Sequence, residues 1–195
     1  KAYSRMDGQK RPAVEEKEII EGCLRGSPVS SRAMVDAYGK LVMAVALNVV
    51  GNREDAEDVC QETFIQVFRH LDRYDPMRNF RTWLLTIVYR RSIDMIKKKR
   101  RFSEFSARAR FDPALAERGG NPHPADPKPL PSALLTKLSP RERTALCLWA
   151  NEGYTARDIS EVLECSASTA RVYLFNARRK IKVLLENDHG LLQNS

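Results

Sequence analysis

Hydrophobic residues recur along this chain at intervals of three and four, which is the spacing of amphipathic α-helices. Between residues 31 and 50, for example, Met34, Val35, Tyr38, Leu41 and Val42 follow it. The pattern predicts helices over approximately residues 15–27, 31–50, 52–71, 80–101, 139 to at least 149, 155–163 and 167–185. No segment alternates hydrophobic and polar residues as strands do, and no repeat of fixed period is present. We therefore predict an all-α fold.

Residues with well-defined stop and start chemistry separate these stretches. Gly51 ends the second helix, and Asn52 is suited to cap the third. Ser139-Pro-Arg-Glu142 and Thr155-Ala-Arg-Asp158 have the pattern of capping boxes. The helix starts in the second half of the chain are therefore the most sharply predicted.

The composition changes between Phe102 and Pro131, where prolines and a Gly119-Gly120 pair make a sustained helix or strand implausible. We place a Pro/Gly-rich linker at residues 103–132. It joins two small helical domains, at 15–102 and 133–187, with a flexible leader at 1–14 and a tail at 188–195.

The last two predicted helices, separated by a break at Glu164-Cys-Ser166, have the layout of a helix-turn-helix in a winged-helix-like domain. The second of them carries five basic residues before its first acidic residue, Glu186. These are Arg171, Arg178, Arg179, Lys180 and Lys182. This charge favours insertion into the DNA major groove, and a helical hairpin that packs on another surface is the alternative.

A second basic region lies between Tyr89 and Arg110, where nine Lys and Arg residues face only Asp94 and Glu104. Such a charge density can neutralise phosphates with release of counterions, although it can also be a solvated helix end. The net charge of the whole chain also favours a polyanionic partner. It is +8, because there are 33 Lys and Arg residues and 25 Asp and Glu residues.

Aromatic residues flank a predicted loop at 72–79, and unstacked bases of single-stranded DNA bind such rings. Phe80 and Trp83 share helical spacing with Leu84, so core packing is the default interpretation for each ring taken separately. Tyr74 is the freer candidate.

The sequence offers little support for catalysis, metal binding or export. The four cysteines are far apart and do not have metal-ligand spacing, which favours reduced thiols in a cytoplasmic protein. We see no nucleophile motif and no phosphate-binding glycine loop, and we predict no cofactor, no metal and no enzymatic activity. The apolar run Leu41–Leu47 is too short to span a bilayer, and the N-terminus lacks the apolar core of a signal peptide.

Several of these segments together resemble a known family. The string Asp55-Ala-Glu-Asp-Val-Cys-Gln-Glu-Thr-Phe64, followed by Phe80-Arg-Thr-Trp-Leu84, resembles the first domain of extracytoplasmic-function (ECF, group 4) sigma factors of bacterial RNA polymerase. Leu138–Arg143, Tyr154–Ile159 and Ser168–Arg171 resemble the second domain. The resemblance covers about residues 15–101 and 130–185.

The resemblance implies a subunit that directs core RNA polymerase to promoters and has no small-molecule substrate. Asp55, Asp58, Gln61 and Glu62 would dock on the clamp helices of the largest subunit, and the second domain on the flap of the second-largest. The linker would thread toward the active-site channel. An anti-sigma factor is a further implied partner, and no membrane insertion is implied.

The resemblance also assigns two sets of DNA-binding residues. The set for minus-10 DNA is Tyr74, Asn79, Phe80, Arg81, Trp83, Arg90, Arg91, Lys97 and Lys98. Within it, the basic residues from Arg90 onward would hold the upstream duplex and the fork by phosphate contacts. The set for the minus-35 duplex is Ser166, Ser168, Thr169, Arg171, Val172, Phe175, Asn176, Arg178 and Arg179. Arg171 is the best candidate for a bidentate guanine contact.

Three residues depart from the usual family pattern. Arg90 stands where Asn is usual, Glu164 where the turn usually has Gly, and Asn176 where Arg is common. A left-handed conformation at Glu164 would cost about 1 kcal/mol, which leaves another turn geometry open.

Two other functions remain as alternatives: a helix-turn-helix regulator that acts without polymerase, and an interaction protein whose basic charge is incidental. We also consider oxidation of Cys60 or phosphorylation of Thr63 as ways to tune polymerase affinity. A core position is the stronger interpretation of Cys60.

Overall fold

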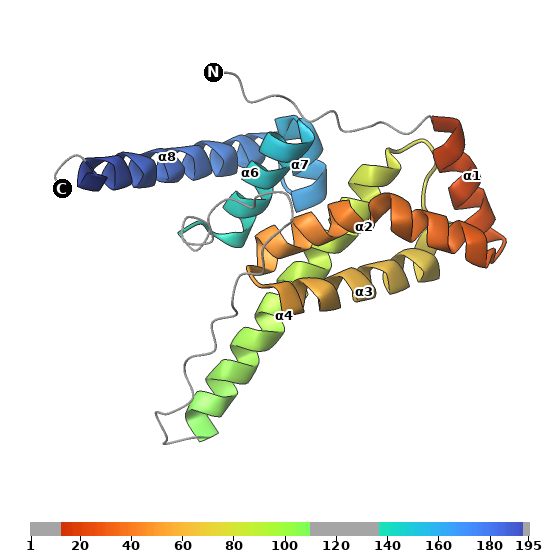
Figure 1. The fold of residues 1–195 in the computed structure, drawn as a ribbon, viewed down its shortest axis with the longest axis horizontal. Coiled ribbons are helices and arrows are strands. Elements are labelled where there is room, and N and C mark those ends of the chain that lie inside the picture. Colours follow the sequence, from red (N-terminus) through yellow and green to blue (C-terminus); the bar gives the residue numbers. More distant parts are fainter. Residues whose placement is uncertain (1–12, 110–136, 193–195) are drawn as a thin grey trace.

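The computed structural model describes residues 13–109 and 137–192, and helices account for all regular structure in these two ranges (Figure 1). They are α1 (Ala13–Leu24), α2 (Pro28–Val50), α3 (Arg53–His70), the short 3-10 helix η1 (Leu71–Arg73), α4 (Phe80–Ala109), α6 (Pro140–Glu152), α7 (Ala156–Leu163) and α8 (Ala167–Leu192). The predicted all-α fold is confirmed. Residues 110–136, which include most of the predicted linker, lie outside the described ranges, as do most of the leader and the end of the tail.

Local sequence chemistry accounts for most helix ends. Ser27 caps α2 by accepting from the Ser30 backbone N–H, and Pro28 occupies the first turn, so α2 begins earlier than the periodicity predicted. Gly51 ends α2 at φ 89°, where a residue without Cβ is unstrained. Asn52 then caps α3 by accepting from the Asp55 N–H at 2.9 Å, as predicted.

Two helices run further than predicted. α4 extends to Ala109 instead of ending near Arg101, and its basic end projects away from the other helices in Figure 1. α8 extends to Leu192 and projects in another direction. The basic end of α4 and the C-terminal end of α8 are therefore held out from the packed body of the protein.

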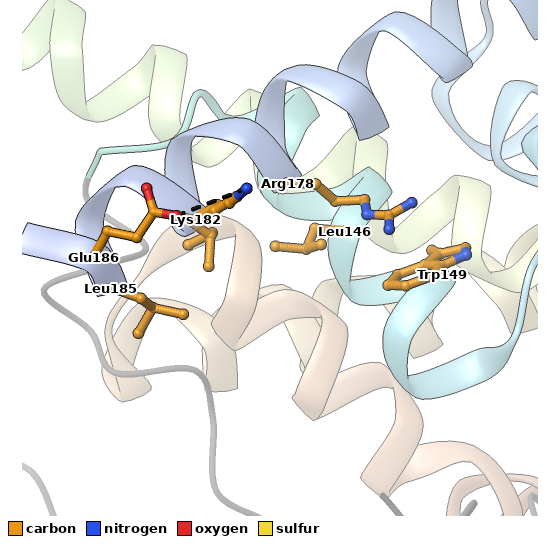
Figure 2. Close-up of a pocket in the computed structure, with 7 residues that line it drawn as sticks. Leu146, Trp149, Arg178, Lys182, Leu185 and Glu186 are labelled. Atoms are coloured by element: carbon orange, nitrogen blue, oxygen red, sulfur yellow. Dashed lines mark ion pairs between the residues drawn. The ribbon is translucent and has the colours of Figure 1, made fainter. Parts of the chain in front are cut away.

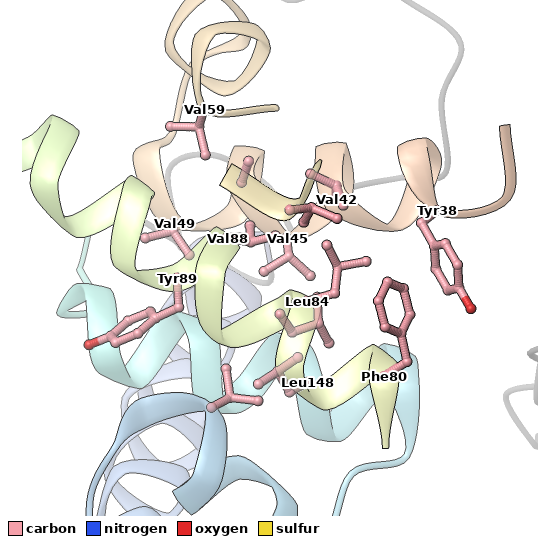
Figure 3. Close-up of a cluster of buried hydrophobic side chains, with 14 of the residues drawn as sticks. Tyr38, Val42, Val45, Val49, Val59, Phe80, Leu84, Val88, Tyr89 and Leu148 are labelled. Atoms are coloured by element: carbon pink, nitrogen blue, oxygen red, sulfur yellow. The ribbon is translucent and has the colours of Figure 1, made fainter. Parts of the chain in front are cut away.

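α2 lies at the centre of the first helical group, α1–α4, and packs against α1, α3 and α4. Its buried face includes Val42, Val45 and Val49, which meet Leu84 and Val88 of α4 (Figure 3). Among the described helices, α2 is long and apolar enough to cross a membrane by length and composition. The run Leu41–Leu47, which is too short to do so, is only part of this helix. Here its apolar face is used for packing.

The second helical group, α6–α8, begins at the predicted capping box, in which the Glu142 N–H donates to Ser139 Oγ and the Ser139 N–H donates to Glu142 Oε2. The Glu142 carboxylate also pairs with Lys180 of α8 at 2.8 Å, and the Glu142 side chain is only 7% exposed. Burial raises the pKa of Glu142, but hydrogen bonds from Lys180 and Ser139 outweigh it and the net pKa is lowered. This pair ties α8 to the start of α6.

The two helical groups are packed against each other, because α6 contacts α2 and α7 contacts α4. Leu148 of α6 is fully buried in the same apolar cluster as Leu84 of α4 (Figure 3). A buried hydrogen bond also crosses the interface, from Asn48 Nδ2 to Cys147 Sγ at 3.0 Å. The structure therefore shows a closed conformation with one shared core.

Candidate nucleic-acid interface

Helices α7 and α8 form the predicted helix-turn-helix, and local hydrogen bonds fix both helix starts. Thr155 and Asp158 make a capping box at α7, and the Thr169 N–H donates to Ser166 Oγ at 3.1 Å at the start of α8. Glu164, between the helices, adopts the left-handed conformation with φ 52° and ψ 51°. The alternative turn geometry considered for Glu164 is therefore wrong, and this glutamate takes a conformation that favours glycine.

Two buried alanines set which face of α8 meets solvent. Ala170 and Ala177 are fully buried and lie seven positions apart, so both point toward the rest of the helical group. The exposed residues of the other face are Ser168, Arg171, Val172, Phe175 and Arg179. Phe175 is 64% exposed, and the Arg179 guanidinium carbon lies 5.9 Å from the centre of its ring. Most of the predicted duplex-binding residues thus share one exposed face.

The other predicted minus-35 residues do not lie on this exposed face of α8. Ser166 and Thr169 take part in the helix cap, with their hydroxyl oxygens 2.8 Å apart, and Asn176 is half-buried. Arg178 lies over the Trp149 ring at 4.8 Å, on the side of α8 that faces α6. It lines an open groove of about 370 Å³ (Figure 2). The residues that line this groove are Leu146, Trp149, Arg178, Ile181, Lys182, Leu185 and Glu186.

The first turns of α4 bring predicted minus-10 residues against the second helical group. Arg81 forms an ion pair with Glu152, the last residue of α6. Arg90 makes a bidentate contact with Glu164, in which Arg90 Nε donates to Glu164 Oε2 at 3.0 Å. Hydrogen bonding between the two side chains raises the pKa of Arg90 and lowers that of Glu164. Arg91 is half-buried and lies 3.6 Å from Asp94.

Lys97 and Lys98 lie further along α4 and are exposed. They lie in the C-terminal half of α4, whose far end projects from the body of the protein (Figure 1). The next residue, Lys99, instead pairs with Asp55 at 2.6 Å, and the Asp55 side chain is 7% exposed. Asp55 also accepts from the Asn52 side chain at 2.7 Å. Asp55, predicted to bind polymerase, is therefore buried in a local polar network.

The predicted aromatic site is a packed cluster in this conformation. Phe80 is 1% exposed, and its ring contacts Tyr38 and Tyr74 edge to face at 5.2 Å each. Trp83 is half-buried and its ring lies 5.6 Å from that of Phe80. Phe80 is thus a core residue here, as its helical spacing favours. Asn79 caps α4 by accepting from the Thr82 N–H at 3.0 Å.

The acidic helix α3 presents a mixed surface. Asp58 and Gln61 are exposed, and Glu62 is half-buried. Ile65, 47% exposed, lies four positions after Gln61, and Phe68, 39% exposed, lies three positions after Ile65. Phe68 lies four positions after the buried Phe64, so helical spacing predicts it on the buried side of α3. Helical spacing alone did not predict this exposed apolar surface. The residues at one edge of the apolar stripe of α3 are exposed although their spacing is the same as that of the buried ones.

Neither residue considered for modification is readily accessible. Thr63 is fully buried, and Cys60 is half-buried with its pKa raised to about 11, chiefly by burial. A thiol with such a pKa is almost entirely protonated at neutral pH and is a poor nucleophile. Within residues 13–109 and 137–192, no group of three or more His, Cys, Asp or Glu side chains is placed to hold a metal ion.

Two family models match the chain. The model described as "Sigma-70 region 2" matches residues 34–102, which span α2 to most of α4. The model described as "Sigma-70, region 4" matches residues 132–181, which include the helix-turn-helix. The first match thus falls in the first helical group without α1, and the second falls in the second helical group as far as residue 181 of α8.

Similar proteins include the RNA polymerase sigma factor CnrH of Cupriavidus metallidurans, 30% identical over 168 residues, which cover 78% of this chain and 88% of CnrH. The ECF RNA polymerase sigma factor SigE of Mycolicibacterium smegmatis is 30% identical over 76% of this chain and 59% of its own. SigW of Bacillus subtilis, another ECF sigma factor, is 33% identical over 43% of this chain and 45% of its own. The chain therefore spans only about half of the length of SigE and SigW.

Two solved structures share the fold. CnrH in complex with the cytosolic domain of CnrY has a TM-score of 0.63 at 23% identity and covers 89% of this chain and 99% of its own. The sigma factor RpoE of Bartonella quintana, in complex with the anti-sigma factor NepR, has a TM-score of 0.65 at 22% identity, covering 80% and 96%. From the two matched regions and the identity to CnrH, the chain belongs to the extracytoplasmic-function sigma factors.

Proposed function

We propose that this chain binds bacterial core RNA polymerase and directs it to promoters, with α8 contacting the minus-35 duplex and α4 the melted minus-10 strand. The observation that carries the proposal is the exposed face of α8, because a helix-turn-helix presents its second helix to the major groove. Arg171, Val172 and Phe175 lie together on that face. We infer action in the cytoplasm, where the polymerase acts.

Arg171 is the base-reading residue of this proposal. It is exposed near the start of α8, where the N-terminal residues of a recognition helix reach base edges. A bidentate guanine contact contributes about 1–3 kcal/mol of discrimination against other bases. Val172 and Phe175 offer apolar contact to thymine methyl groups beside it.

Lys97 and Lys98 would contact phosphates rather than bases. Their exposure in the C-terminal half of α4 suits phosphate contacts, which position DNA without reading its sequence. Each neutralised phosphate of duplex DNA adds about −0.9 to the slope of log affinity against log salt. We expect the Lys97→Ala, Lys98→Ala variant to reduce that slope by about 2.

Polymerase would dock on two surfaces. On α3, Asp58 and Gln61 adjoin the exposed Ile65 and Phe68, so charge and apolar contact lie side by side, as in the core of a protein interface. The groove between α6 and α8, which Trp149 and other apolar side chains line, is the proposed site for the flap (Figure 2). Because the similar RpoE structure is a complex with the anti-sigma factor NepR, an anti-sigma factor is a proposed regulator.

Run-off transcription with bacterial core polymerase and a library of randomised promoters tests this function. We expect two-box promoters to be enriched by the wild type and lost with the Asp58→Arg, Gln61→Arg variant, whose exposed substitutions reverse the docking charge. Arg171→Ala should relax preference at one minus-35 position, whereas Arg25→Ala, an exposed arginine distant from α8, should not. Duplex binding without any polymerase-dependent initiation would instead support a regulator that acts alone.

A further inference from the structure

The contact between the two helical groups carries two charge pairs of the same polarity. Arg81 and Arg90 come from α4, while Glu152 and Glu164 come from the second helical group. Within each pair the residues are more than 70 positions apart, at |i−j| of 71 and 74. No local helix pairing can therefore account for either contact.

Both arginines belong to the α4 residues that the family resemblance assigns to minus-10 DNA. An arginine that donates two hydrogen bonds to a carboxylate presents the same donors that would bind a phosphate. Arg90 gives Nε and a second guanidinium nitrogen to Glu164. Glu164 therefore occupies the group by which Arg90 would hold a DNA phosphate.

The backbone at Glu164 gives an independent observation. Among the described residues, Glu164 is the only one other than glycine with positive φ, at 52°. Glycine adopts this conformation freely, whereas a residue with a Cβ is strained in it. Such a strained position points to a role for the side chain, and the carboxylate is what a glycine would lack.

The two residues that depart from the family pattern at these positions are thus partners. Arg90 stands where the family usually has Asn and Glu164 where it usually has Gly, and in this structure their side chains are hydrogen-bonded to each other. The hydrogen-bonded pair therefore accounts for both departures together. The pair joins two residues that both depart from the usual pattern of the family.

The two pairs differ in how strongly salt should weaken them. The side chains of Arg90 and Glu164 are 55% and 49% exposed, so solvent ions screen this pair. Arg81 and Glu152 are 29% and 15% exposed and are better shielded. An apolar contact that includes Leu148 and Tyr89 supports both pairs. The closed conformation should therefore open gradually, not completely, as salt rises.

We propose that the Arg81–Glu152 and Arg90–Glu164 pairs form an interdomain latch that excludes promoter DNA from α4. In the closed conformation the two carboxylates neutralise the arginines, and in the open one the arginines are free for phosphates. The DNA half of this proposal rests on the proposed function, while the latch itself does not. DNA or polymerase binding would then select the open conformation by population shift.

The test compares the full chain with the Glu152→Gln, Glu164→Gln variant, which keeps side-chain size and removes both negative charges. Its control is Glu54→Gln, Glu161→Gln, which changes the net charge equally at positions 54, exposed on α3, and 161, exposed on α7. Small-angle X-ray scattering measures compactness, and amide hydrogen exchange of α6 and α7 reports opening that is too rare to change the scattering. Fluorescence anisotropy with a forked minus-10 oligonucleotide measures DNA affinity.

We expect the latch variant to exchange α6 and α7 amides about 2- to 10-fold faster than the control and to bind the fork more tightly by a similar factor, as for two partly exposed ion pairs. The four-fold charge reversal Arg81→Glu, Arg90→Glu, Glu152→Arg, Glu164→Arg should restore slow exchange. It should not show the gain in DNA affinity, because glutamates replace the two arginines that would bind phosphate. Exchange equal to that of the control would overturn the latch. Faster exchange without any gain in DNA affinity over the control would overturn the exclusion of DNA.

The same data separate this proposal from the proposed function. If neither the wild type nor any variant binds the fork, the assignment of α4 to promoter DNA fails, and the exchange rates still decide whether the pairs close the molecule. If the wild type binds DNA and supports initiation but the exchange rates of the latch and control variants agree, the proposed function stands and the latch is refuted.

Discussion

Replacement of Phe80 by alanine separates a structural from a DNA-binding role for this ring. Phe80 is 1% exposed and lies at the start of α4, where its ring contacts those of Tyr38, Tyr74 and Trp83. If it serves the core, Phe80→Ala should destabilise the free protein whether or not DNA is present. If it serves only to stack on a base, the variant should fold as well as the wild type.

The size of the effect follows from burial. Deletion of a buried phenylalanine ring costs about 3–5 kcal/mol, from lost transfer free energy and the cavity that remains. A buried area of about 150–250 Å² at about 25 cal/mol per Å² gives about 4–6 kcal/mol, an upper value because unfolded chains are partly compact. For a chain of this size, a loss of 3–5 kcal/mol lowers Tm by roughly 6–20 °C.

Urea denaturation and thermal melting, both followed by far-UV circular dichroism, measure this loss. Phe80→Leu keeps an apolar side chain and should cost about 1 kcal/mol. Phe175→Ala is the matched control, because Phe175 is 64% exposed on the proposed DNA face and its loss should change stability by no more than about 0.5 kcal/mol. An unchanged urea midpoint for Phe80→Ala, together with impaired promoter opening, would refute this reasoning.

Three further predictions concern other parts of the fold. Glu142→Gln should destabilise the α6–α8 contact by about 1–3 kcal/mol in urea melts, because a partly buried, charge-assisted contact is lost. Folding lowers the pKa of Glu142, so its contribution to stability is present above the unfolded pKa and is lost as pH falls from about 5 through the folded pKa. The stability of the variant should therefore depend less on pH in this range than that of the wild type. Gly22→Ala should lower Tm because the new Cβ would lie 2.7 Å from the Cβ of Ser30 in α2. Gly39→Ala, whose nearest contact is 4.0 Å away, should instead raise stability by about 0.5–1 kcal/mol. Equal effects of the two substitutions would contradict this packing. Cys147, buried and with its pKa raised to about 12, chiefly by burial, should be the last thiol alkylated by iodoacetamide at neutral pH, as mass spectrometry of the native and urea-unfolded chain can show.

The boundaries and character of most helices could be predicted from the sequence because they depend on neighbouring residues. Caps such as Asn52, Ser139 and Thr155 act over three positions, and their hydrogen bonds are present as predicted. The family resemblance assigned Arg171 and Phe175 to the DNA-binding set, and both are exposed on α8. The later ends of α4 and α8 were missed because the residues there have no strong stop signal.

The tertiary structure alone decided which polar and aromatic residues are covered. Asp55 and Asp58 belong to one acidic motif, yet only the first is buried, because Lys99 from α4 packs beside it. Arg90 and Glu164 each looked like an isolated departure from the family pattern, and their pairing depends on the packing of α7 against α4. Helix periodicity is a local property that one sequence displays directly. The pairing of residues 74 positions apart depends on how two amphipathic surfaces meet, and no local pattern encodes that arrangement.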